Sequence, residues 1–251
     1  NYILLCSNTA VSDVVIEALE AKDENDIPRQ EITTKVKRID QLNDDVMALH
    51  LQTPRVQRLR FLAGQSVSLT LPDGNTTDLP IASCPCDDRN LLFHIDINSG
   101  NITTNVIRDA LAKGDEIKVS GPHGHFLLDE DSKRTQLYLA YGTGFAPIKS
   151  LIEHAMAIDE SANMHLYWMA DKKEDLYLNN LCRSWNDALE SFNYHPVIGK
   201  DVMQIVSDEQ ANLADCDVYL AGHEVQTINV KQWLLDNSLP KEQLFINSIK
   251  E

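Results

Sequence analysis

Hydrophobic residues follow two different periods along this chain. In the first half, from Glu31 to about Val119, apolar and polar residues alternate in short runs. The apolar members of these runs are Val67, Leu69 and Leu71, then Phe93, Ile95 and Ile97, then Ile117 and Val119. Strict alternation is typical of strands that bury one face, so this half is predicted to be mostly β-sheet.

One stretch of the first half has a helical period instead. Apolar residues within Thr104–Lys113 share one helical face, and Gly114 is expected to end the helix. Several short strands with turns and one helix predict a small antiparallel β-barrel.

The second half alternates strand-like and helix-like segments. The predicted strands are Gln136–Ala140, Met164–Met169, Asn193–Ile198, Asp217–Ala221 and Leu244–Ile246. The predicted helices are Ile148–Ala157, Leu176–Leu189, a short one within Asp201–Leu213, and Val225–Asn237. Repeated β-α units require a parallel sheet with right-handed crossovers. The chain is therefore expected to hold a β-barrel domain over residues 31–130 and an α/β parallel-sheet domain over residues 131–251, after an N-terminal segment and linker over residues 1–30.

A glycine-rich turn joins the first strand of the second half to its first helix. Gly142 and Gly144 flank Thr143, and Pro147 suits the first helical turn, where a missing N–H has no cost. Without Cβ atoms, the phosphates or ribose of a ligand can approach this backbone closely. The turn predicts a nucleotide site at the carboxyl end of the sheet, although a tight turn without a ligand gives the same pattern.

Composition excludes several classes of partner. The 251 residues include 43% hydrophobic ones, and the net charge of −16 argues against nucleic acid and anionic membranes. No apolar run approaches the length of a membrane helix, so no membrane insertion is expected. Five cysteines without framework spacing fit a reducing, cytoplasmic compartment.

Four short motifs occur in one order over much of the chain. They are Phe61-Leu-Ala-Gly-Gln65, Gly121-Pro-His-Gly-His-Phe126, Gly142-Thr-Gly-Phe-Ala-Pro147 and Leu220-Ala-Gly222. Together they resemble the ferredoxin–NADP reductase superfamily, and the chain is most similar to bacterial flavin reductases and oxygenase reductase components. The resemblance implies a flavin between a barrel and a nicotinamide-nucleotide domain.

The resemblance also implies where the flavin binds. Its pyrophosphate is expected at the helix start formed by Gly100, Asn101, Ile102 and Thr103, followed by Thr104. Its ring is expected beside Leu79, Pro80, Ile81, Ala82 and Ser83.

The ring motif departs from the family pattern of Arg-x-Tyr-Ser. Thr77, Leu79 and Pro80 replace the arginine, the aromatic residue and the serine, so a phosphate partner, a stacking surface and a donor to flavin N5 are lost. Backbone groups of Ile81, Ala82 and Ser83 remain as candidate contacts to the ring. FAD is favoured over FMN, since its adenosine half adds contacts that offset the lost arginine.

The nicotinamide nucleotide is expected on the other domain. Its implied contacts are Gly142, Thr143, Gly144, Pro147, Asp171, Ala221, Gly222 and His223. Asp171 would repel a 2′-phosphate and accept from a free 2′-hydroxyl, which favours NADH over NADPH. No catalytic acid or base is implied, because the cofactors carry the chemistry.

The N-terminus resembles the end of a plant-type ferredoxin domain. Cys6 would be the fourth ligand of a [2Fe–2S] cluster, and the other ligands are absent, so a cluster is expected only with upstream residues. A stray apolar strand is the alternative. Elsewhere, Cys84 and Cys86 are interpreted as small packing residues beside the flavin pocket, since a Cys-x-Cys disulfide is strained.

The leading hypothesis is an NAD(P)H-dependent flavoprotein reductase that passes electrons through FAD to an iron–sulfur centre or an oxygenase partner. The alternative is a non-catalytic or regulatory subunit that keeps the fold with a degenerate flavin site, and Thr77, Leu79 and Pro80 motivate it.

Overall fold

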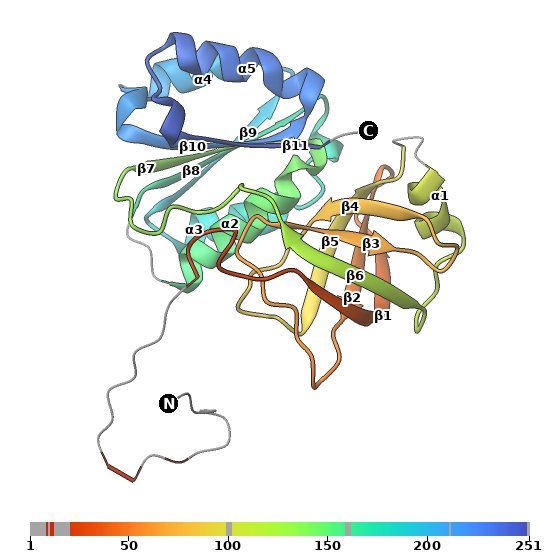
Figure 1. Ribbon diagram of the computed structural model, residues 1–251. Coiled ribbons are helices and arrows are strands. Elements are labelled where there is room, and N and C mark those ends of the chain that lie inside the picture. Colours follow the sequence, from red (N-terminus) through yellow and green to blue (C-terminus); the bar gives the residue numbers. More distant parts are fainter. Residues whose placement is uncertain are drawn as a thin grey trace.

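A computed structural model of the chain describes residues 9, 11–12, 21–98, 102–158, 162–210 and 212–249. In this part of the chain, the strands form one six-stranded and one five-stranded sheet, side by side and each with its own hydrophobic core (Figure 1). The barrel followed by a parallel sheet, predicted from the hydrophobic periods, is confirmed.

The first sheet is antiparallel, in the order β4-β3-β6-β1-β2-β5. Its strands are β1 (Gln30–Gln41), β2 (Val46–Gln52), β3 (Ser66–Thr70), β4 (Thr76–Pro80), β5 (Asn90–Asp96) and β6 (Glu116–His123). The alternating residues of β3, β5 and β6, such as Val67 and Phe93, are fully buried inside it. The two edges meet just after β4, where the N–H of Ala82 donates to the carbonyl of Leu92 over 2.7 Å, so the sheet is nearly closed into a barrel.

The helix of the barrel is shorter than expected. α1 spans Ile102–Asp109, so it begins before the predicted Thr104 and ends before Lys113. Gly114 is not its cap: it has a φ of 99°, and its N–H donates to the carbonyl of Val36 over 2.8 Å. This glycine instead makes the turn into β6, a conformation that a residue with a Cβ rarely adopts.

The second sheet is parallel, in the order β11-β10-β7-β8-β9. Its strands are β7 (Thr135–Tyr141), β8 (Met164–Ala170), β9 (Phe192–Ile198), β10 (Cys216–His223) and β11 (Leu244–Ile249). Its helices are α2 (Phe145–Ala157), α3 (Asn179–Ala188), α4 (Val202–Glu209) and α5 (Glu224–Asp236). In Figure 1, α2 and α3 cover the face toward the barrel, whereas α4 and α5 cover the opposite face. Across the described residues, no helix is long and apolar enough to cross a membrane.

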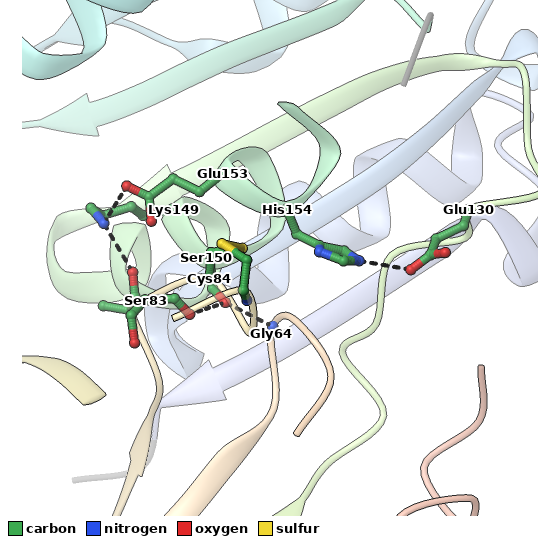
Figure 2. Close-up of a disulfide and its surroundings, with 10 residues drawn as sticks. Gly64, Ser83, Cys84, Glu130, Lys149, Ser150, Glu153 and His154 are labelled. Atoms are coloured by element: carbon green, nitrogen blue, oxygen red, sulfur yellow. Dashed lines mark hydrogen bonds and ion pairs between the residues drawn. A yellow bond between two sulfur atoms is a disulfide. The ribbon is translucent and has the colours of Figure 1, made fainter. Parts of the chain in front are cut away.

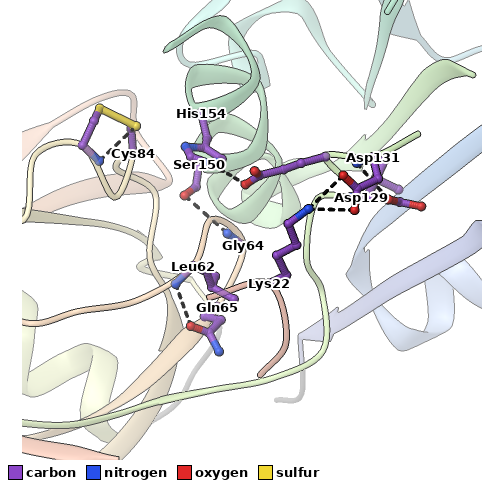
Figure 3. Close-up of polar contacts among 12 residues, drawn as sticks. Lys22, Leu62, Gly64, Gln65, Cys84, Asp129, Asp131, Ser150 and His154 are labelled. Carbon is purple, nitrogen blue, oxygen red and sulfur yellow. Dashed lines mark hydrogen bonds and ion pairs between the residues drawn. A yellow bond between two sulfur atoms is a disulfide. The ribbon is translucent and has the colours of Figure 1, made fainter. Parts of the chain in front are cut away.

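The segment before the barrel is docked on the connection between the two sheets. The ammonium group of Lys22 lies 2.8 Å from a carboxylate oxygen of Asp131, which follows β6 (Figure 3). The backbone N–H groups of Lys22 and Asp23 both donate to the Asp26 carboxylate over 2.9 Å, which folds this segment into a turn. The predicted ferredoxin remnant with Cys6 lies outside the described residues.

Candidate functional site

The glycine turn lies at the carboxyl end of β7, as predicted. Gly142 and Gly144 form a 3₁₀ turn that leads directly into α2, with Pro147 buried in the first turn of that helix. Gly142 has a φ of 49°, and a Cβ added to it would meet no atom within 4 Å. The first N–H groups of a helix have no carbonyl partner one turn earlier, so this turn presents bare backbone donors to the adjoining space.

The turn at the end of β10 packs against the glycine turn. A Cβ on Gly144 would lie 2.3 Å from the carbonyl oxygen of Ala221, and one on Gly222 would lie 2.7 Å from the Cβ of Tyr141. Both glycines are therefore required by close approach between neighbouring strands. Beside them, His223 has a buried Nδ1 with no hydrogen-bond partner among the described residues. A buried, unpaired imidazole nitrogen is suited to a polar ligand group.

The glycine turn borders a cleft of about 500 Å³ that both sheets share. Gly142 and Thr143 line it from the glycine turn, and Asp171 lines it from the end of β8. Asp45 and Asp96 line it from the barrel. A cleft of this volume at the carboxyl ends of parallel strands is typical of a nucleotide site. Of the residues predicted on the nicotinamide side, Gly142, Thr143 and Asp171 line this cleft, whereas Gly144, Pro147, Ala221, Gly222 and His223 do not.

Charge in the cleft is mostly negative. Carboxylates of Asp45, Asp96, Asp171 and Asp175 line it, and Lys200 supplies a positive charge after β9. Sequence reasoning missed Lys200, although residues that follow a parallel strand lie at the same sheet edge as the glycine turn. By contrast, Lys172 and Lys173 follow Asp171 and are exposed.

A buried histidine links the barrel to the rim of this cleft. His94, on β5, is 3% exposed, and its Nδ1 lies 2.9 Å from the hydroxyl of Tyr177. Burial is the main reason why the pKa of His94 lies well below its usual value, and the nearby positive charge of Lys149 lowers this pKa further. Burial also raises the pKa of the Tyr177 hydroxyl. Both side chains are therefore neutral near pH 7, and neither was singled out in the sequence.

The ring of Phe145 connects this pair to the core of the second sheet. It lies 6.4 Å from the His94 ring and stacks on Trp168 with centroids 3.9 Å apart. Trp168 in turn donates its indole N–H to the carbonyl oxygen of Gly142 over 3.2 Å. The glycine turn is thus hydrogen-bonded to a buried aromatic stack in the core of the second sheet.

The predicted flavin-ring segment has few free backbone groups. The N–H of Ile81 donates to the carbonyl of Gln65 over 3.0 Å, and that of Ala82 is paired with Leu92. The carbonyls of Ala82 and Ser83 accept from Lys149 at 3.1 Å and from Ser150 at 2.8 Å. Since Pro80 has no N–H, the expectation of ring contacts through these backbone groups loses most of its donors.

Side chains of the same segment also face the protein. Leu79 pairs with Val67 across the β3–β4 ladder and packs against the barrel core, and Pro80 is buried. The Ser83 hydroxyl accepts from the N–H of Leu92 over 3.2 Å. None of Leu79, Pro80, Ile81, Ala82 and Ser83 lines the 500 Å³ cleft.

The predicted phosphate end of the flavin site is only partly described. Gly100 and Asn101 lie outside the described residues, and Ile102 and Thr103 are the first two residues of α1. Thr104 follows and is 8% exposed. A helix start at this place supplies a dipole that favours a phosphate.

A small polar network joins the barrel to α2 (Figure 3). The N–H of Gly64 donates to the Ser150 hydroxyl over 3.4 Å, and that hydroxyl donates to the carbonyl of Ser83. Gly64 cannot carry a side chain, because its φ is 87° and a Cβ would lie 2.0 Å from the carbonyl oxygen of Phe126. Within the Phe61–Gln65 motif, Gly64 therefore contributes to the contact between the barrel and α2.

The interpretation of Cys84 and Cys86 as unpaired packing residues is wrong. The structure joins them in a disulfide, with Cα atoms 5.2 Å apart, in the turn after β4 (Figure 2). That separation lies within the range a disulfide can span. Among the described residues, no group of three or more acidic, histidine or cysteine side chains is placed to hold a metal ion.

Comparison with known proteins identifies both halves. Residues 33–127 match the family model of the oxidoreductase FAD-binding domain, and residues 138–232 match that of the oxidoreductase NAD-binding domain. The first match covers the barrel, and the second covers most of the parallel-sheet unit.

Curated relatives are similar along most of the chain. The reductase component of propane 2-monooxygenase from Gordonia sp. (strain TY-5) is 28% identical over 263 residues, covering 97% of this chain and 76% of the relative. An NAD(P)H-flavin reductase from Aliivibrio fischeri is 29% identical over 231 residues, and the alignment covers 85% of this chain and 96% of that reductase.

Solved structures share the fold. A ferredoxin NADP+ reductase from Neisseria gonorrhoeae, with bound FAD and NADP, superposes with a TM-score of 0.76 at 16% identity. The superposition covers 91% of this chain and 99% of that one.

Proposed function

Because the chain belongs to the ferredoxin–NADP reductase superfamily, with its FAD-binding and NAD-binding domains, we propose that it oxidises NADH and passes the electrons to an iron–sulfur centre or an oxygenase component. It is an NAD(P)H-dependent flavin oxidoreductase. When bound, FAD supplies the chemistry, since it accepts a hydride and releases electrons one at a time. The observation that carries the proposal is the cleft that the glycine turn and the barrel share.

The glycine turn and the adjoining end of β10 fit a nicotinamide nucleotide. The bare backbone of Gly142, Thr143 and Gly144 would hold the pyrophosphate, with Pro147 fixing the helix behind it. Gly222 lets the backbone of β10 come close, next to the buried Ala221. His223, with its unpaired Nδ1, would hydrogen-bond the carboxamide of the nicotinamide.

Asp171 supports the choice of NADH. It lines the cleft after β8, together with Asp175, so a 2′-phosphate there would meet negative charge. A carboxylate accepts hydrogen bonds from a free ribose hydroxyl, whereas it repels a phosphate. Lys200 lies in the same cleft and would pair with the pyrophosphate.

The flavin site fits FAD at its phosphate end. There, Thr104 and the preceding residues of α1 would hold the pyrophosphate by the helix dipole. Around the ring, Leu79 and Pro80 offer apolar contact, and the donors of Ile81 and Ala82 are already used by the barrel. FAD is therefore proposed to bind mainly through its phosphates and adenosine, with weak polar contact to the ring.

The class of the relatives supports a proposal for the electron acceptor. Proteins named as reductase components of oxygenases work with a separate partner, and we propose an acceptor of this kind for this chain. We further propose a cytoplasmic location, in agreement with the free thiols of Cys182 and Cys216. Cys6 would complete a [2Fe–2S] site only together with upstream residues.

Flavin reconstitution followed by anaerobic titration with NADH tests the proposal. We expect a yellow protein whose flavin absorbance is bleached by NADH, with electrons recovered on an artificial one-electron acceptor. A chain that folds but stays colourless in excess FAD would instead support the non-catalytic alternative that Thr77, Leu79 and Pro80 suggest. Bound FAD that NADH leaves oxidised would contradict the assignment of the cleft.

A further inference from the structure

The disulfide lies outside the nucleotide cleft, in the turn between β4 and β5. Cys86 is an exposed residue, whereas Cys84 is only 5% exposed, so Cys86 is the more accessible member of the pair. A reagent in solution would therefore reach the sulfur of Cys86 first. Exposed disulfides are the labile ones, since thiolate attack requires access to a sulfur atom.

A backbone donor is placed to help the bond open. The N–H of Cys86 lies 3.2 Å from the Sγ of Cys84 and points to it as a donor. If a nucleophile attacks Cys86, Cys84 leaves as a thiolate, and this N–H stabilises the negative charge that forms. A better leaving group leaves faster in thiol–disulfide exchange.

We propose that Cys84 and Cys86 form a thiol–disulfide exchange site whose substrate is a dithiol. One thiolate of the dithiol bonds to the sulfur of Cys86, the Cys84–Cys86 bond breaks, and Cys84 takes up a proton. The second thiol of the dithiol then attacks its own mixed-disulfide sulfur, which releases Cys86. The dithiol is oxidised to a disulfide, and the cysteine pair is reduced by two electrons and two protons.

As in other intramolecular disulfides, reduction of this pair favours a dithiol over a monothiol. After attack by a monothiol, Cys84 is separated from the mixed disulfide on Cys86 by only one residue, with Cα atoms 5.2 Å apart. Its return attack is intramolecular and outruns a second monothiol from solution. The second thiol of a dithiol also attacks the mixed disulfide intramolecularly, so it competes with the return attack of Cys84.

The remaining described cysteines do not share this chemistry. Cys182 and Cys216 are buried and free, and burial raises the pKa of both thiols, that of Cys216 to about 11. Thiols of this kind are inert toward disulfides. They give an internal control for any reaction at Cys84 and Cys86.

The pair is positioned to affect the contact between the two sheets. The carbonyl of Ser83, the residue before Cys84, accepts a hydrogen bond from the Ser150 hydroxyl of α2 (Figure 2). The ammonium group of Lys149, also on α2, donates to the carbonyl of Ala82. Opening the disulfide removes the covalent link across the turn that carries these acceptors. In the cytoplasm proposed for this chain, disulfides are usually transient and redox-active, which agrees with an exchange role.

Thiol mapping on the folded chain tests the proposal. The protein is oxidised with diamide and then incubated with dithiothreitol or with 2-mercaptoethanol at equal total thiol. Acid quenching, alkylation in denaturant and peptide mass spectrometry then report each cysteine. We expect Cys84 and Cys86 to be linked after oxidation, and reduced at least about tenfold faster by the dithiol. Separate thiols after oxidation, equal rates, or reduction only in denaturant would each overturn the proposal.

Two single variants test the assigned roles. In Cys84→Ser, the remaining Cys86 should react rapidly with a chromogenic disulfide reagent, whereas in Cys86→Ser the buried Cys84 should react at least about tenfold more slowly. Circular dichroism of both variants checks that they are folded. Equal rates in folded variants would contradict the attack on Cys86, and the wild-type comparison stands if either variant fails to fold.

Discussion

The indole N–H of Trp168 reaches across from β8 to the carbonyl oxygen of Gly142, 3.2 Å away, at the start of the glycine turn. Trp168 is fully buried, so this bond is shielded from water. Because the other face of the turn borders the cleft, the bond ties the position of the ligand-facing backbone to the core of the sheet.

Replacing this tryptophan should therefore weaken binding of NADH. Trp168→Phe keeps the stack on Phe145 but removes the donor, which costs about 1 kcal/mol, or about a fivefold rise in KM for NADH. Steady-state kinetics measure it. Trp185→Phe is the control, since Trp185 packs near Phe145 with centroids 6.5 Å apart. An unchanged KM in Trp168→Phe would show that the bond does not position the turn.

The two glycines of the turn should respond differently to alanine. In Gly144→Ala the new Cβ would lie 2.3 Å from the carbonyl oxygen of Ala221, so β7 and β10 must separate. We expect a loss of about 3 kcal/mol in unfolding free energy, in the range of severe overpacking, and no detectable binding of NADH. Chemical denaturation and titration calorimetry measure both.

Gly142→Ala is the matched control for that prediction. Its Cβ would meet nothing within 4 Å, and only the φ of 49° opposes it. The expected cost is about 1–2 kcal/mol, the usual penalty of a left-handed residue. Equal losses in the two variants would mean that close approach to Ala221 is not what requires a glycine at 144.

Local patterns predicted those parts of the fold in which one face of an element is buried. β5 alternates because Phe93 and Ile95 point into the barrel. β2 was not distinguished, because Val46, Met47, Ala48 and Leu49 are all buried and leave no period of two. In β1, a fully buried polar residue, Thr34, interrupts the apolar pattern, and its hydroxyl donates to the carbonyl of Ile117 over 2.9 Å.

The candidate site was predictable only where it is local in sequence. The turn from Gly142 to Gly144 is a continuous motif, and Asp171 follows a recognisable strand. By contrast, His94 and Tyr177 are 83 residues apart and meet only through packing of the barrel on the second sheet. The spacing of Cys84 and Cys86 allows a disulfide, but the strain of a Cys-x-Cys bridge favours two separate thiols, so the pair is not predicted from the sequence.

Burial of His94 should make stability depend on pH. The pKa of this histidine is well below 6.5 in the folded chain, so below pH 6.5 the unfolded chain binds more protons. The contribution of neutral His94 to the free energy of unfolding is therefore complete above pH 6.5. It is lost as the pH falls below 6.5, at up to about 1.4 kcal/mol per pH unit. Urea unfolding between about pH 7.5 and 5.5 should show this slope.

The His94→Gln variant isolates the contribution of this residue. The slope should become shallower but not vanish, because His50, His165 and His195 also have lowered pKa values from burial. His125→Gln is the control, since that side chain is exposed. If both variants keep the wild-type slope, His94 is not buried in its neutral form.

Selection of the nicotinamide nucleotide should depend on Asp171. In Asp171→Ser the carboxylate that faces the proposed 2′-position is replaced by a hydroxyl, so the repulsion of a 2′-phosphate falls. We expect the ratio of kcat/KM for NADPH over NADH to rise about tenfold, or about 1.4 kcal/mol. Glu174→Ser is the matched control, because it removes the same charge from an exposed residue that does not line the cleft. An equal rise in both variants would show a general charge effect. A wild-type protein that already prefers NADPH would overturn the assignment of Asp171.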